Sequence, residues 1–87
     1  MVIDLTSVLV QNGANYRQFP KGILFESGIA LNGVASDIFV LIDGQKTIKE
    51  IASTISSSYE TNLDIVSADI IALAKTLLEE GLIEIHE

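Results

Sequence analysis

The spacing of apolar and polar residues changes once along this chain, from a strand-like to a helical periodicity. In the first third, short apolar or alternating runs are separated by turn-forming residues such as Asn12-Gly13, a pattern typical of β-strands joined by tight turns. Two of the runs form a tight hairpin across Ser27-Gly28. We expect three strands in this region, and the first of them is either of the two early runs, residues 7–10 or 16–19. The candidate strands are residues 7–10, 16–19, 22–26 and 28–31.

After residue 31 the apolar residues recur at helical spacing. Asn32 is a suitable N-cap for a first helix, because its side chain accepts a hydrogen bond from a free amide of the first turn. Asp43-Gly44 ends this helix, since glycine adopts the left-handed conformation of a helix C-terminus. The apolar set of this helix is Val34, Ala35, Ile38, Phe39, Leu41 and Ile42.

A second, short helix follows. Thr47 and Glu50 form a capping-box pattern at its start. Three consecutive serines, Ser56-Ser57-Ser58, weaken its end because their hydroxyls compete for backbone groups. We expect Tyr59 to pack back onto the core from the loop that follows. The buried stripe of this helix is Ile48, Ile51, Ala52 and Ile55.

The third helix is predicted to be the longest. It opens at Asn62 or Asp64 and stops at Gly81, and residues 82–85 alternate like a short final strand. Ile71 and Leu78 widen its apolar face, either as surplus surface or as completion of the core. The shared face is Leu63, Val66, Ile70, Leu73, Ala74 and Leu77.

Composition limits the class of protein. The 87 residues predict one domain, residues 1–87, with a core available from 48% apolar residues. The chain has no Cys, which excludes disulfides and thiolate metal sites. The net charge of −7 opposes nucleic-acid binding, which depends on Lys and Arg. With no signal-peptide pattern and no membrane-length apolar run, we expect a cytoplasmic protein with no membrane partner.

Residues suited to catalysis are scarce. His86 is the only His and lies next to the C-terminus, where a functional imidazole would be poorly held. Asp69 is the best candidate for a catalytic carboxylate, but a solvated helix face explains it better. Gly44 lacks the earlier glycine of a phosphate-binding loop. We therefore expect a protein that is not an enzyme, with no catalytic residue, cofactor or metal.

One ordered set of short motifs resembles the PqqD-like family, the recognition modules that bind precursor peptides in ribosomal-peptide maturation. The resemblance covers roughly residues 15–85, and it departs from the family pattern at Gly33-Val34, where members usually carry a polar residue. The matching motifs are Leu24-Phe25-Glu26, Leu31-Asn32, Ala35, Ile38, Asp43-Gly44, Thr47, Ile51, Tyr59, Asp69-Ile70, Leu77 and Gly81-Leu82-Ile83.

This resemblance implies an α+β fold of the winged helix-turn-helix type, with a three-stranded N-terminal antiparallel sheet followed by three helices. It implies a non-catalytic leader-peptide-binding module, a peptide chaperone that presents a precursor peptide to a maturation enzyme, often a radical SAM protein. The leader would add as a strand beside the third helix. The implied peptide-binding residues are Gly28, Ile29, Ala30 and Leu31 on the strand and Ala68, Ile71, Lys75 and Leu78 on the helix.

Two other functions remain open from the residues. A winged-helix DNA-binding regulator fits the succession of helices, although Lys75 is the only base in the third helix. An acyl or peptidyl carrier fits the size and acidity, although the Asp-Ser-Leu motif of that family does not occur. A free sheet edge also permits self-pairing, so the chain is expected to be a monomer or a homodimer.

Overall fold

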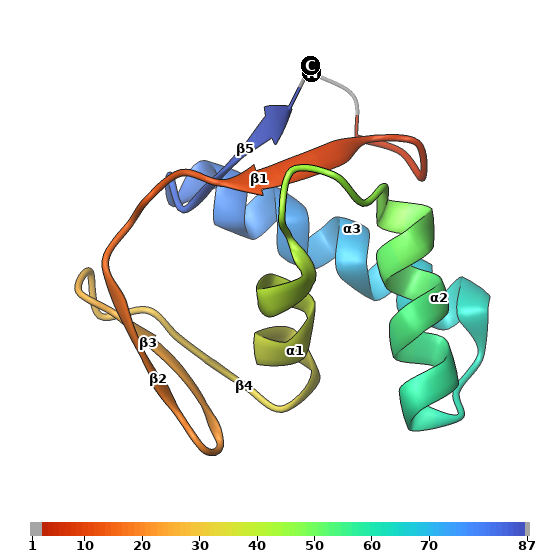
Figure 1. Ribbon diagram of the computed structural model, residues 1–87, viewed down its shortest axis with the longest axis horizontal. Coiled ribbons are helices and arrows are strands. Elements are labelled where there is room, and N and C mark those ends of the chain that lie inside the picture. Colours follow the sequence, from red (N-terminus) through yellow and green to blue (C-terminus); the bar gives the residue numbers. More distant parts are fainter. Residues whose placement is uncertain (1–2, 87) are drawn as a thin grey trace.

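A computed structural model of the protein describes residues 3–86. It confirms the predicted α+β fold, in which an antiparallel sheet precedes three helices (Figure 1). Figure 1 shows this sheet at one end of the molecule and α2 at the other. The elements are β1 (Val8–Gln11), β2 (Tyr16–Phe19), β3 (Gly22–Phe25), β4 (Ala30–Asn32), α1 (Val34–Leu41), α2 (Ile48–Tyr59), α3 (Leu63–Glu79) and β5 (Ile83–His86).

Both early apolar runs are strands, but they belong to different sheets. β2, β3 and β4 form the three-stranded sheet in that order, so the later run supplies its first strand. The predicted hairpin across Ser27-Gly28 joins β3 to β4, with Ile23 opposite Leu31. β1 instead pairs antiparallel with the final strand β5, and Leu9 lies opposite Ile85. The alternation at residues 82–85 therefore predicted a real strand.

The first helix starts one residue later than Asn32 predicts. Gly33 is the N-cap, with φ 57° and no side-chain cap, because Asn32 is still the last residue of β4 opposite Gly22. The Ser36 hydroxyl donates to the Gly33 carbonyl at 2.8 Å and thereby satisfies a backbone group at this corner. The helix also ends earlier than predicted, at Leu41, and Ile42 follows it into the core.

The second helix has the predicted capping box, but it does not end at the serines. The Glu50 amide donates to the Thr47 hydroxyl at 3.2 Å, and the Glu50 carboxylate accepts from the Thr47 amide at 2.9 Å. The helix continues to Tyr59, since the Ser56 hydroxyl bonds the Thr61 carbonyl beyond the helix end instead of disrupting it. Tyr59 is 45% exposed, so the expectation that it packs into the core was wrong.

The third helix begins after Asn62, whose side chain accepts from the amides of Asp64 and Ile65. Gly81 follows the helix with φ 74°, as the predicted stop requires. Four positions of the predicted stripe are buried, but Leu63 is 42% exposed because it occupies the first turn, outside the packed length. The buried four are Val66, Ile70, Ala74 and Leu77.

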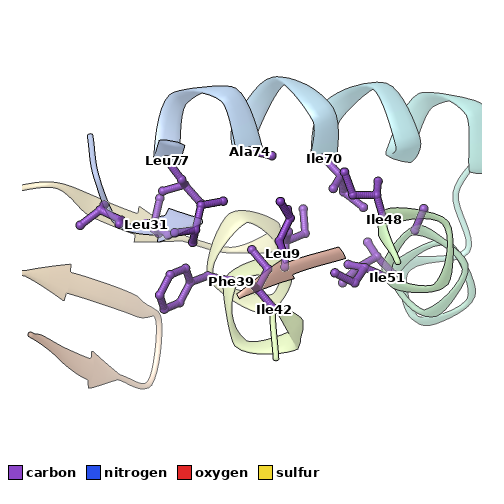
Figure 2. Close-up of a cluster of buried hydrophobic side chains, with 14 of the residues drawn as sticks. Leu9, Leu31, Phe39, Ile42, Ile48, Ile51, Ile70, Ala74 and Leu77 are labelled. Atoms are coloured by element: carbon purple, nitrogen blue, oxygen red, sulfur yellow. The ribbon is translucent and has the colours of Figure 1, made fainter. Parts of the chain in front are cut away.

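All elements except β2 contribute to one buried cluster. Figure 2 shows this cluster beneath α3, with Leu9 of β1 among side chains from the helices. Next to it, three aromatic rings join the sheet to α1. The Phe39 ring meets Phe25 edge-on at 5.1 Å between centroids and Tyr16 at 5.3 Å. These contacts hold the three-stranded sheet against the helices.

Candidate functional site

The outer edge of β4 is the feature of this fold that is best suited to bind a polypeptide. β4 lies at one end of the sheet order and pairs with β3 on a single side. The chain's own C-terminal strand does not cover it, because β5 pairs with β1. An edge strand of this kind presents backbone amides and carbonyls to which another extended segment can add.

The hydrogen bonds on either side of β4 establish which residues face outward. The Phe25 amide donates to the Ile29 carbonyl at 2.8 Å, and the Gly33 amide donates to the Lys21 carbonyl at 3.4 Å. Residues of an antiparallel pair alternate between bonded and non-bonded positions. Ile29, Leu31 and Gly33 therefore turn their backbone groups toward β3. Ala30 and Asn32 turn theirs toward the free edge.

The side chains of β4 alternate in the perpendicular direction. Leu31 is 8% exposed and points into the core, whereas Ala30 and Asn32 are exposed on the outer face. On that face, Phe19 and Leu24 border a shallow apolar hollow of about 370 Å³ that also touches Ala30. A strand added at this edge would thus have apolar surface beside its outer side chains.

The four helix residues expected at the site lie on one side of α3. Ala68 and Lys75 are exposed, whereas Ile71 and Leu78 are partly buried and pack against the core. The two apolar residues therefore contribute to the core and still keep some accessible surface. Leu31 and Leu77 share the buried cluster, and Figure 2 places Leu31 beneath the C-terminal end of α3. β4 and α3 thus contribute to the same buried cluster, but none of the described hollows is lined by both β4 and the four predicted helix residues.

A second hollow lies where the three helices meet, directly after β4. Its volume is about 350 Å³. Ile55 and Val66 are buried at its floor, and Val34, Tyr59 and Ile65 are exposed around it. Asp69 and Thr61 also line it. The sequence pattern missed this hollow, because Ile65 lies outside the apolar stripe and Val34 was assigned to the core face.

A protein-family model matches most of this chain, including the strand and the helices of the site. The model of the family described as coenzyme PQQ synthesis protein D (PqqD) matches residues 22–83, which is more than half of the chain. The chain belongs to the PqqD family. The matched region runs from β3 to the start of β5 and therefore contains the edge strand, all three helices and the hollow between them.

A solved relative confirms the fold of this PqqD-family chain. It is the PqqD truncation of Methylobacterium extorquens PqqCD, whose solution NMR structure is described as a functional, stand-alone recognition element for ribosomally synthesized and post-translationally modified peptides. The two structures agree with a TM-score of 0.77, at 22% sequence identity, over 95% of each chain. No curated protein matches the chain.

Two titratable groups of this PqqD-family protein with shifted pKa values lie near helix ends, Asp43 after α1 and Tyr59 at the end of α2. A 2.6 Å hydrogen bond from the Lys46 ammonium is the main reason why the pKa of Asp43 is lowered to about 2. The Tyr59 hydroxyl donates to Asp37, and this hydrogen bond raises the pKa of Tyr59. Within residues 3–86, no group of three His, Asp or Glu residues is placed to hold a metal ion.

His86 is exposed, but it is held as the last residue of β5, opposite Val8. No helix in the described part of the chain is long and apolar enough to cross a membrane.

Proposed function

We propose that this protein binds the leader segment of a ribosomally made precursor peptide and presents it to a maturation enzyme, without catalysing a reaction itself. The observation that carries the proposal is the free edge of β4, where Ala30 and Asn32 turn their backbone groups outward. Membership of the PqqD family supports it, as does a fold shared with a stand-alone recognition element.

The leader would add as a strand along residues 28–31 and the adjoining Asn32, the last residue of β4. Leader residues opposite Ala30 and Asn32 exchange hydrogen bonds with the edge, and their side chains lie on the outer face of the sheet. The leader residue opposite Leu31 points toward the face on which α3 packs. We propose that Ala68, Ile71, Lys75 and Leu78 form the helix wall of this groove. Lys75 can pair with a leader carboxylate, which contributes less than about 1 kcal/mol at an exposed site.

The protein presents the precursor to the enzyme by holding it in place and not by a chemical step. A bound leader holds the rest of the precursor near the enzyme's active site and raises its effective concentration there. We propose a radical SAM enzyme as the partner class, a cytoplasmic location, and a monomer or homodimer. The net charge of −7 favours this function over a DNA-binding regulator.

The proposal is tested by locating a short precursor gene near the gene of this chain and titrating a labelled peptide that carries its leader sequence. Replacing single leader amides by N-methyl amides removes one donor at a time without changing the protein. Strand addition predicts that affinity falls at every second leader position, by roughly 2- to 12-fold for each hydrogen bond lost. Uniform losses, or none, would contradict strand addition.

Proline substitutions in β4 provide the matched protein-side test. Ala30→Pro removes an outward donor, so leader affinity should fall while circular dichroism keeps the folded spectrum. Leu31→Pro removes an inward donor and should destabilise the sheet itself. A folded Ala30→Pro variant with unchanged affinity would place the peptide elsewhere.

A further inference from the structure

The hollow at the junction of the three helices has the properties of a specificity pocket. Large exposed apolar residues gather around it: Val34 is 39% exposed, Tyr59 45% and Ile65 59%. A concentration of exposed apolar surface marks an interaction site more often than scattered residues do. The volume of about 350 Å³ lies at the small end of ligand pockets, which span roughly 300–1,000 Å³. It suits one large side chain and its neighbour.

We propose that this hollow receives an apolar side chain of the leader peptide, from the residues immediately N-terminal to the segment that pairs with β4. This inference rests on the proposed function and adds the anchor that would select the peptide sequence. Its occupant follows from continuity with the edge strand, because Val34 lines the hollow only two residues after Asn32, the last residue of β4.

The direction of the added strand determines which part of the leader arrives there. All pairs in this sheet are antiparallel, and a strand added in the same way runs opposite to β4, so that its N-terminal end lies beside Asn32. At about 3.3 Å per residue, one to three further residues reach past Gly33 and Val34. The anchoring residue is therefore one to three positions before the leader residue that faces Asn32.

The charges around the hollow indicate which residue type should stand next to the apolar anchor in the leader peptide. Asp69 lines the hollow, and Asp37, which accepts the hydrogen bond from Tyr59, lies next to it. No Lys or Arg is among the lining residues. The one ion pair within residues 3–86 joins Lys46 to Asp43, which leaves Asp69 without such a partner in the described part. A Lys or Arg beside the apolar anchor complements this carboxylate.

A matched pair of variants isolates the hollow. Ile65→Glu places a charge at its rim, and because Ile65 is 59% exposed the substitution leaves the core unchanged. Leu63→Glu is the control, because Leu63 is also exposed in the first turn of α3 but does not line the hollow. Asp69→Asn removes the proposed charge partner while keeping the shape.

The probe is a displayed library of random 20-residue peptides, selected on the full chain and on each variant and then sequenced. Wild type and Leu63→Glu should enrich an apolar residue flanked by Lys or Arg, just before an extended apolar-alternating segment. Ile65→Glu should lose the apolar enrichment, and Asp69→Asn should lose the basic one. A peptide that was selected on the wild-type protein and contains this anchor should bind the Ile65→Glu variant about tenfold more weakly than wild type. This difference corresponds to about 1.4 kcal/mol of binding free energy.

The outcomes separate this inference from the proposed function. Suppose that Ala30→Pro abolishes peptide selection, but the peptides selected on wild type share no apolar anchor, or those selected on Ile65→Glu still share it. The pocket is then refuted and strand addition stands. If Ala30→Pro retains the whole selected pool, or wild type selects nothing, the proposed function fails as well. If Ile65→Glu leaves peptide binding intact but weakens binding of the maturation enzyme, the hollow is an enzyme-docking site and the inference is overturned.

Discussion

The aromatic contacts around Phe39 yield a stability prediction that can be worked out from the structure. Phe39 is 1% exposed and packs edge-on against both Phe25 and Tyr16, with interplanar angles of 89° and 87°. Each such pair contributes about 0.5–1.5 kcal/mol beyond the burial of its surface. Phe39→Leu keeps an apolar side chain in the core but removes both pairs. It should therefore lower the free energy of unfolding by about 1–3 kcal/mol.

Urea titration followed by circular dichroism measures this loss. The midpoint should fall with an unchanged slope, and the melting temperature should fall by about 4–8 °C for each kcal/mol lost. Val40→Ala is the matched control, because the neighbouring residue of the same helix is 49% exposed and should change stability by no more than about 0.5 kcal/mol.

A double-mutant cycle separates ring pairing from simple loss of volume. Phe25→Leu and Phe39→Leu, alone and together, should give a coupling energy of about 0.5–1.5 kcal/mol. If Phe39→Leu costs no more than Val40→Ala, or the two core substitutions are additive, the rings do not hold the sheet to α1 in the way argued above.

Two further predictions concern the connection between α1 and α2. Thr47→Ala removes the hydroxyl of the capping box and should lower the free energy of unfolding by about 1 kcal/mol in the same urea titration; no change would show that Glu50 alone caps α2. The pKa of Asp43 is about 2 in the folded chain against 3.8 for an isolated group, so its contribution is complete above about pH 4 and disappears as pH falls toward 2. Asp43→Asn should therefore reduce the acid sensitivity of the melting temperature in this window, and an identical pH profile would contradict the assignment.

Features determined by neighbouring residues could be read from the sequence. The capping box at Thr47, the Asn62 cap and the hairpin at Ser27-Gly28 all follow from contacts within a few positions. Asn32 was misread as a cap because a local rule competed with the sheet, and the ladder to β3 kept Asn32 in the strand.

Features determined by distant contacts could not be read in this way. Tyr59 follows three serines that suggest a loop, yet its hydroxyl bonds Asp37 from the preceding helix and the helix extends to meet it. The hollow beside Val34 requires three helices to converge, and no periodicity within one helix encodes that arrangement. The edge of β4 was inferred from the family resemblance, whereas its outward residues follow only from the hydrogen-bond register.

The C-terminal strand explains why β4 remains open. Gly81 turns the chain after α3, and the Asn12 amide and side chain donate to Leu82 and Gly81, so β5 pairs with β1 from its first residue. The other side of β1 is also occupied, since the Gly44 amide donates to Leu9 and the Ile48 amide to Ser7. Both sides of β1 are thereby occupied by the chain itself, whereas β4 is paired on one side only.

The two outer strands of the three-stranded sheet still differ in what they offer a partner. All four residues of β2 are exposed, and Arg17 and Gln18 place polar side chains along it, which discourages strand addition. β4 is short, carries Leu31 into the core on one face, and borders the apolar hollow of Phe19 and Leu24 on the other. A strand added beside β4 therefore lies next to Ala30 and the adjoining hollow, while a strand beside β2 lies next to Arg17 and Gln18 in the middle of that strand, although Phe19 at its end is apolar. This difference supports the proposal that the leader peptide adds at β4 and not at β2.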